Sequence, residues 1–431
     1  MTVPANDRVR PRVRFNPFGA EFRRDPYPLY QRLRESEPVH RTLGMWVLTR
    51  HADIRAVLQD RSFSAGLIPR LVAEQAERLG RRDTARIARL GRKSLVFTDN
   101  PDHARLRGLV NRVFTAQAVA ELRPLISGVV ADVWHAATPA DEFDVIADFA
   151  APIPVRVLSE WMALPADLRG QVGLWTHDIR FLLEPGMMKA ADFDRVHEVV
   201  ERFAEALGDV LAERRSRPGP DLISRLLAAR TSGGDALSEE ELIFVCIMCF
   251  VAGNETTTSL IGNGVLALLR HPDQAALLRR DPTRAGAAVR ETLRYDPPLQ
   301  LTKRLATRDI EIGGTPIAAG DQLLLCLGAA NRDPSVFDRP DAFDPTRSGA
   351  DHLAFGHGMH GCLGGILARA QAEIAFEHLF RHAPDLALRG DEFHWQEHSF
   401  IVRGLSRLPV GVVGARVADT RAPGDNVAVS R

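Results

Sequence analysis

The sequence predicts a mostly α-helical protein with small β-sheets. Apolar residues recur at helical spacing through most of the 431 positions, whereas strand-like patterns are short and local. The composition is 45% hydrophobic, which is enough to bury a large core. No internal repeat is visible. We therefore expect one continuous domain over residues 15–413, with a polar segment at 1–14 and a disordered tail at 414–431.

Helical spacing is clearest at residues 26–36, 52–60, 103–114, 193–216, 239–270, 286–295 and 363–380. In the longest of these, Ser238 followed by Glu241 forms a capping box and Pro272 marks the end. At about 1.5 Å per residue, about 30 residues span about 45 Å. This helix is therefore long enough to cross the domain.

Strand signals occur at residues 38–42 and 45–49, on either side of Gly44, and again over residues 309–326. In the second region, Gly313, Gly314 and Gly320 punctuate runs of β-type residues. These segments predict small sheets beside a helical body.

The centre of the long helix is polar within an apolar surrounding. The stretch "AGNETTTS" occupies residues 252–259. Contact between helices explains Thr257, Thr258 and Ser259, but not the residues before them. Gly253 removes a side chain where a ligand could approach, and Glu255 and Thr256 supply an acid and an alcohol.

A second unusual stretch is "FGHGMHGCLG" at residues 355–364, which places Cys362 just before a predicted helix. The start of a helix favours a thiolate. Three interpretations compete: a buried structural thiol, a thiolate ligand of heme iron, and a zinc site formed with His352, His357 and His360. Zinc ranks lowest, because no second paired cluster is present. Cys246, Cys249 and Cys326 lie in apolar runs and are expected in the core.

Charge and hydropathy narrow the functional classes. Lys plus Arg and Asp plus Glu both total 55, so the net charge is zero and no overall field attracts nucleic acid. The longest apolar run, at residues 242–252, is shorter than the roughly 20 residues of a membrane span. Four cysteines form no disulfide framework. We expect a cytoplasmic protein without a membrane span.

The spacing Phe355-x-x-Gly358-x-x-x-Cys362-x-Gly364 resembles the heme-binding signature of the cytochrome P-450 family. Three further motifs resemble that family in its order. They are "HARLR" at 103–107, "AGNET" at 252–256 and "ETLR" at 291–294. The resemblance runs from about residue 15 to residue 413.

The resemblance implies the cytochrome P-450 fold, with heme b (iron protoporphyrin IX) between the long central helix and the Cys362 loop. Cys362 would be the metal ligand, whose thiolate favours O–O cleavage. The other cofactor-binding residues implied are His103, Arg107, Ala252, Gly253, Arg304, Phe355, Gly356, His360 and Gly364. Four of them match positions that bind the heme propionates in the family, namely His103, Arg107, Arg304 and His360. Glu255 and Thr256 would deliver protons to bound dioxygen.

Two structural features are also implied by the resemblance. Glu291, Arg294 and Arg347 match a structural clamp of charged side chains. The substrate pocket would be formed by Leu95, Val96, Phe97, Phe181, Leu182, Leu183, Phe250, Leu299, Leu301, Phe400 and Ile401. Because these residues are apolar, a lipophilic small molecule is expected as the substrate.

The implied activity is insertion of one oxygen atom from O2 by hydroxylation or epoxidation. Electrons would come from a ferredoxin or flavodoxin with its reductase, since the residues after Val413 leave no room for a flavin domain of at least about 50 residues. Arg105 and Arg112 are candidates for contact with an acidic donor. A monomer is expected. The alternatives are a peroxide-driven peroxygenase and a non-enzymatic heme-thiolate sensor.

Overall fold

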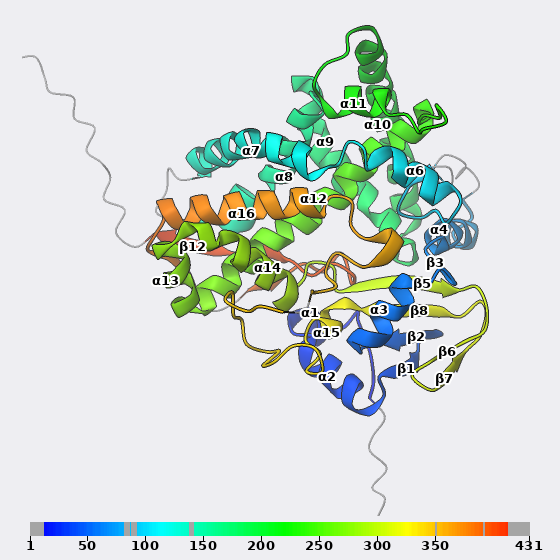
Figure 1. Ribbon diagram of the computed structural model, residues 1–431, viewed down its shortest axis with the longest axis vertical. Helices are drawn as coiled ribbons and strands as arrows, with labels where there is room; N and C mark the ends of the chain where they lie inside the picture. The colour runs from blue at the N-terminus through cyan, green and yellow to red at the C-terminus, as the bar shows by residue number, and fades with distance from the viewer. Residues whose placement is uncertain are drawn as a thin grey trace, which may run out of the picture.

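The computed structural model describes residues 13–81, 87, 93–137, 142–349, 351–390 and 393–412. The tail expected at 414–431 and most of the N-terminal segment expected at 1–14 lie outside the described residues. Figure 1 shows the long helices at one end of the molecule and most strands at the other.

The α-helices are α1 (Ala20–Arg24), α2 (Tyr27–Ser36), α3 (His51–Gln59), α4 (Leu67–Arg78), α6 (Asp102–Val110), α7 (Ala116–Ala137), α8 (Pro152–Trp161), α9 (Ala166–Ile179), α10 (Ala190–Ser216), α11 (Leu222–Ala228), α12 (Glu239–Arg270), α13 (Pro272–Arg280), α14 (Ala285–Tyr295), α15 (Leu327–Ala330) and α16 (Gly365–His382). Short helical turns are η1 (Val145–Ala150), η2 (Arg180–Leu183), η3 (Pro185–Met187), η4 (Pro282–Arg284) and η5 (Gly358–His360). Each stretch predicted from helical spacing is helical.

The strands are β1 (Val39–Thr42), β2 (Met45–Leu48), β3 (Phe63–Ser64), β4 (Glu142–Asp144), β5 (Leu301–Ala306), β6 (Ile310–Ile312), β7 (Thr315–Ile317), β8 (Gln322–Cys326), β9 (Leu386–Leu388), β10 (His394–Trp395), β11 (Leu405–Arg407) and β12 (Pro409–Val412). The largest sheet has the order β1-β2-β8-β5-β3, in which β2 and β8 are parallel and the other pairs antiparallel. The predicted strands at 38–49 and 309–326 are confirmed.

Helix α12 forms the centre of the molecule and contacts α8, α9, α10, α14 and α16. Its first turn has the predicted capping box, with Ser238 and Glu241 bonded reciprocally. A Cβ on Gly264 would lie 2.2 Å from Cζ of Phe376 on α16. The glycine therefore allows α12 to cross α16 closely.

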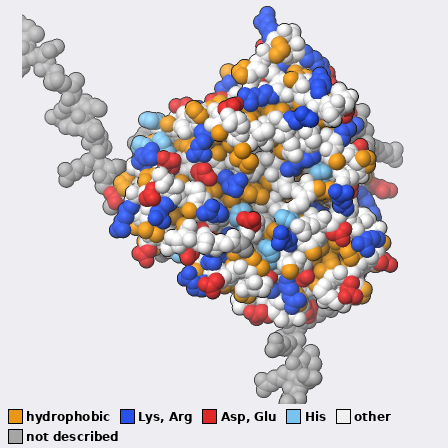
Figure 2. Space-filling view, viewed as in Figure 1, with side chains coloured by type: hydrophobic (Ala, Val, Ile, Leu, Met, Phe, Trp, Pro, Cys, Tyr) orange, Lys and Arg blue, Asp and Glu red, His pale blue; other side chains and the backbone are white. Residues whose placement is uncertain are grey.

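The surface charge and the hydropathy of α12 bear on the partners expected from the sequence. Figure 2 shows acidic and basic side chains interspersed over the face in view. Within the described ranges, α12 is the one helix long and apolar enough to cross a membrane, but 61% of its most apolar window is buried inside the protein. This burial is typical of a core helix.

Candidate active site

The segment around Cys362 is a closed loop directly before α16. The amide of Cys362 donates to the carbonyl of Phe355 over 2.8 Å. Gly356 and Gly358 both have positive φ, at 68° and 69°, and a Cβ on Gly358 would lie 2.5 Å from the Leu58 carbonyl oxygen. These two positions therefore require glycine.

The Cys362 thiol has an exposed surface, although it lies among many protein atoms. Burial raises its pKa above the ordinary value, against the opposing effects of the Gly364 amide and the charge of Arg107. The start of a helix does not by itself produce the thiolate that the sequence led us to expect. A metal ion bound at the sulfur would deprotonate it outright.

The predicted propionate-binding residues converge from α6, β5 and the Cys362 loop. The rings of His103 and His360 lie 4.2 Å apart, and the Nε2 atoms of both are buried without a hydrogen-bond partner. Burial, followed by the charges of His360 and Arg107, lowers the pKa of His103 to about 4. Burial also lowers the pKa of Arg304 to about 10, and its Nη1 donates only to the Lys303 carbonyl. These unsatisfied donors fit the carboxylates of a heme.

Asp99 is a member of this cluster that the sequence did not indicate. Its Oδ1 lies 3.9 Å from Nε2 of His360, and it accepts a hydrogen bond from the Ala65 amide over 3.0 Å. The position of Asp99 just before α6 was the available signal. Its carboxylate partly balances the cations around it.

The polar centre of α12 is more open than its flanks. Ala252 is exposed and Glu255 and Thr256 are half-buried, while Val251 and Thr257 are buried. The Thr256 hydroxyl donates to the Ala252 carbonyl over 2.6 Å, a local bond that can bend a helix. A Cβ on Gly253 would lie 3.3 Å from Leu158 of α8, so α8 packs closely against this part of α12, and the ligand approach expected at Gly253 stays a prediction.

Glu255 is ion-paired with Nε2 of His398, which lies in the loop between β10 and β11. The ring of His398 in turn lies 6.0 Å from that of His177 at the end of α9. The sequence analysis did not identify either histidine. Their distance from Glu255 along the chain hid the contact.

The eleven residues expected to line the substrate pocket differ in their burial, and their role in a pocket stays a prediction. Phe250 is fully buried, with its ring 5.8 Å from that of Phe203 on α10. Leu301 is also fully buried, in a cluster that includes Tyr30 and Phe400. Both are core residues, because the phase of α12 and the pleat of β5 turn them away from solvent. Val96, in contrast, is 42% exposed.

The other predicted pocket residues are distributed among the clusters as follows. Phe97 and Leu182 are buried in the largest core cluster, and Phe181 and Leu183 are partly buried against it. Leu299 and Ile401 each pack against one of the two smaller clusters. Leu95 is half-buried. These residues are therefore apolar and mostly buried, as a pocket for a lipophilic molecule and a core would both require.

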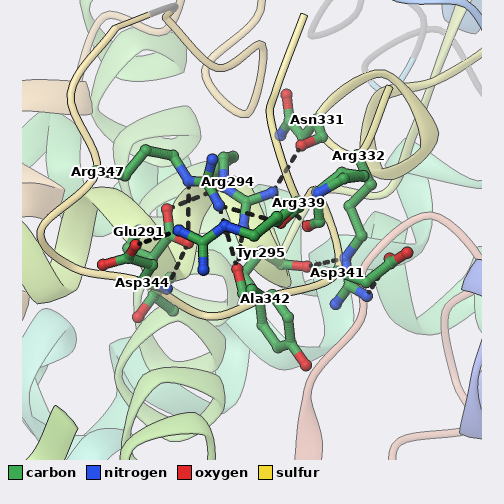
Figure 3. A network of polar contacts seen from close by, with 12 residues as sticks. Glu291, Arg294, Tyr295, Asn331, Arg332, Arg339, Asp341, Ala342, Asp344 and Arg347 are labelled. Atoms are coloured by element: carbon green, nitrogen blue, oxygen red, sulfur yellow. Dashed lines mark hydrogen bonds and ion pairs between the residues drawn. The ribbon is translucent and has the colours of Figure 1, made fainter. Parts of the chain in front are cut away.

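Glu291, Arg294 and Arg347 lie together, as Figure 3 shows. Arg294 donates Nε and Nη2 to the carboxylate of Glu291 over 2.9 and 2.7 Å. It also donates to the carbonyls of Asn331, Pro340 and Ala342, and Arg347 Nε lies 3.6 Å from Glu291. The side chains of Glu291 and Arg294 are only 4% and 3% exposed. This buried arrangement is the clamp implied by the resemblance.

The zinc interpretation is wrong for the described residues. No three His, Cys, Asp or Glu side chains in these ranges are grouped to hold a metal ion. His357 bonds to Gln59 instead, at 2.7 Å. Cys246 and Cys326 are buried core thiols, as predicted, and burial raises the pKa of the half-buried Cys249 to about 12.

Comparisons with known proteins agree with this geometry. The sequence model of the family described as Cytochrome P450 matches residues 155–383. The chain is 38% identical to vitamin D(3) 25-hydroxylase of Pseudonocardia autotrophica, over 93% of this chain and 97% of that protein. It is 33% identical to the polyketide biosynthesis cytochrome P450 PksS of Bacillus subtilis, over 93% and 99%. The solved structure of CalO2 has 38% identity and a TM-score of 0.85, and covers 93% of this chain and 99% of its own.

Proposed function

The chain belongs to the cytochrome P450 family, and we propose that it inserts one oxygen atom from O2 into a lipophilic small molecule, with electrons from a separate redox partner. The protein is an oxidoreductase with heme b as its cofactor, and its named relatives include hydroxylases. Their names, which refer to vitamin D(3) and to polyketide biosynthesis, support a lipophilic substrate.

Cys362 would hold the heme iron, and His103, Arg107, Arg304 and His360 would hold the propionates. The bound heme-thiolate supplies the chemistry that activates dioxygen. The observation that carries this assignment is the closed Cys362 loop, in which the buried, unpartnered Nε2 of His360 lies beside that of His103 on α6.

On α12, Glu255 and Thr256 would supply the protons that the reaction consumes. Thr256 Oγ1 holds its proton toward the Ala252 carbonyl, four residues earlier on the same helix. Glu255 is ion-paired with His398, so its carboxylate has a polar partner outside α12.

We expect the redox partner to be a ferredoxin or flavodoxin with its reductase. Arg105, one of the two candidates for donor contact, is ion-paired with Asp235 at 3.2 Å and with Glu241. These pairs tie it to the start of α12, so Arg105 is a poor candidate. Arg112 is exposed and remains the better one. We propose that the enzyme works as a cytoplasmic monomer.

The test is a comparison of wild type with Cys362→Ala. The reduced carbon monoxide complex of wild type should show the Soret band of a thiolate-ligated heme, and the variant should lose it. Survival of the band in the variant would exclude Cys362 as the ligand. Product formed with a ferredoxin, its reductase and O2 supports monooxygenation, whereas turnover with peroxide alone would favour a peroxygenase.

A further inference from the structure

Arg180 is a buried cation that forms no ion pair with a described carboxylate. It begins η2, directly after α9, and is only 9% exposed. Its guanidinium lies 4.5 Å from the centre of the Phe181 ring. Among the residues that the structure describes, no carboxylate is within ion-pair distance of it. Burying an unpaired charge is costly, so the position requires an explanation.

A structural role accounts for only part of this side chain. Nη1 donates to the His177 carbonyl, which satisfies one acceptor at the end of α9. Nε is buried and has no partner. A cap on α9 therefore leaves donors of the guanidinium unused.

The carboxylates nearest to Arg180 are bound elsewhere. Glu255 is ion-paired with His398, and Glu184 accepts the amide of Phe400 over 2.9 Å. Two further acids, Asp178 and Asp192, pair with Arg195 and with the Lys189 amide, respectively. None of the four bonds to the guanidinium, although their charges favour its protonated form.

The surroundings of Arg180 are those of the proposed reaction site. Among charged groups, Glu255 has the strongest effect on Arg180, and Glu255 directly precedes Thr256 on α12. A second cation, Lys303, lies 5.4 Å from the Phe400 ring, and burial lowers its pKa despite the charge of Glu184. The segments expected to contact substrate thus contain two cations, the buried Arg180 and the half-buried Lys303, that form no ion pair among the described contacts.

We propose that Arg180 binds a carboxylate of the substrate, so that the enzyme oxidises a lipophilic carboxylic acid. The inference rests on the proposed monooxygenase function. A guanidinium presents two parallel N–H donors that match the two oxygens of a carboxylate, and Phe181 supplies an apolar surface beside them. The acid group would be fixed at Arg180, with the apolar remainder toward α12.

The probes for the test are ω-(imidazol-1-yl)alkanoic acids of 8 to 12 carbons and the alkylimidazoles of the same lengths. The imidazole of either probe binds heme iron and shifts the Soret band, and only the acid can also reach Arg180. At one or more lengths, wild type should bind the acid about 10- to 100-fold more tightly than the alkylimidazole, the gain of one charged hydrogen-bonded pair. Calorimetric titration measures the same dissociation constants independently.

Arg180→Gln should abolish this preference and leave alkylimidazole binding within about twofold of wild type. Arg202→Gln, at an exposed arginine of α10 paired with Glu198, is the matched control and should keep the preference. Arg180→Lys retains a positive charge on a shorter side chain but lacks the two parallel N–H donors, so it should keep only part of the preference for the acid. This third variant tests the proposal if Arg180→Gln does not fold.

The outcomes separate the two hypotheses. If the alkylimidazoles do not shift the Soret band of wild type, the heme-thiolate function itself fails. The Arg180 site is refuted if the alkylimidazoles bind but wild type does not bind the acid more tightly at any chain length. It is also refuted if the preference for the acid persists in Arg180→Gln or is unchanged in Arg180→Lys. Loss of the preference in Lys303→Gln but not in Arg180→Gln would assign the anion to Lys303 and refute it as well.

Discussion

Glu291→Gln tests whether the buried clamp holds the Cys362 loop in place. The substitution preserves the size of the side chain but leaves the charge of Arg294 buried without its counter-ion. Arg294 donates to the Asn331 carbonyl, and Asn331 Oδ1 accepts the amide of Leu353 at the start of the Cys362 loop. Disturbing the clamp should therefore loosen the loop before the rest of the fold.

The expected magnitude follows from burial. An exposed ion pair contributes about 0 to 1 kcal/mol, which is the value the i, i+3 spacing alone suggests. Removing one partner of a buried pair costs about 3–5 kcal/mol, because the remaining charge is uncompensated. The side chains here are 4% and 3% exposed, so the larger value applies. It is a large fraction of a typical unfolding free energy of about 5–15 kcal/mol.

Urea denaturation of the holoenzyme, followed by Soret absorbance and by far-UV circular dichroism, measures the effect. Glu291→Gln should lower the urea concentration at which both signals are lost, and the Soret signal should disappear first. Glu377→Gln makes the same chemical change in an exposed pair with Arg381 and should cost about 0 to 1 kcal/mol. An effect of Glu291→Gln no larger than that of Glu377→Gln would refute the clamp.

Further predictions concern protons, cofactor, partner and pH. Thr256→Ala should retain heme but divert electrons to peroxide, and unchanged coupling of electron use to product would return Thr256 to a packing role. Replacing Arg107 and Arg304 together by alanine should lower the heme content of purified protein; full occupancy would contradict their propionate role. The rate of reduction by a ferredoxin should fall as the salt concentration rises and fall further in Arg112→Glu, because complementary charge mainly raises association rates. A rate independent of salt would exclude electrostatic docking of the ferredoxin at Arg112. Burial lowers the pKa of His378 to about 4, so the folded state binds a proton there less readily than the unfolded state, and the protein should lose stability as pH falls from about 6.5 toward 4. His378→Gln should reduce the fall in melting temperature over this pH range, and an equal fall in wild type and variant would contradict the prediction.

Several elements of the fold could be predicted because their signals are local. Helical spacing, the Ser238 capping box and Pro272 were sufficient to place α12, and Gly44 was sufficient to separate β1 from β2. Helix α7 was not named in advance. It continues through Pro124, because its buried face packs against α8 and α16 despite that residue. The short strands β3, β4 and β9 to β12 have too few residues for a clear alternation of apolar and polar positions.

The residues that indicate the chemistry of the site are visible in local patterns. These patterns are the fixed spacing around Cys362, the pair Glu255 and Thr256, and the spacing of Glu291 and Arg294. The partners of these groups become visible only in the folded chain. Glu255 meets His398 across 143 residues of chain, Phe250 turns into the core, and Arg180 is left with unused donors because its neighbouring acids pair elsewhere. Burial and long-range contact depend on packing of distant segments, which no local spacing encodes.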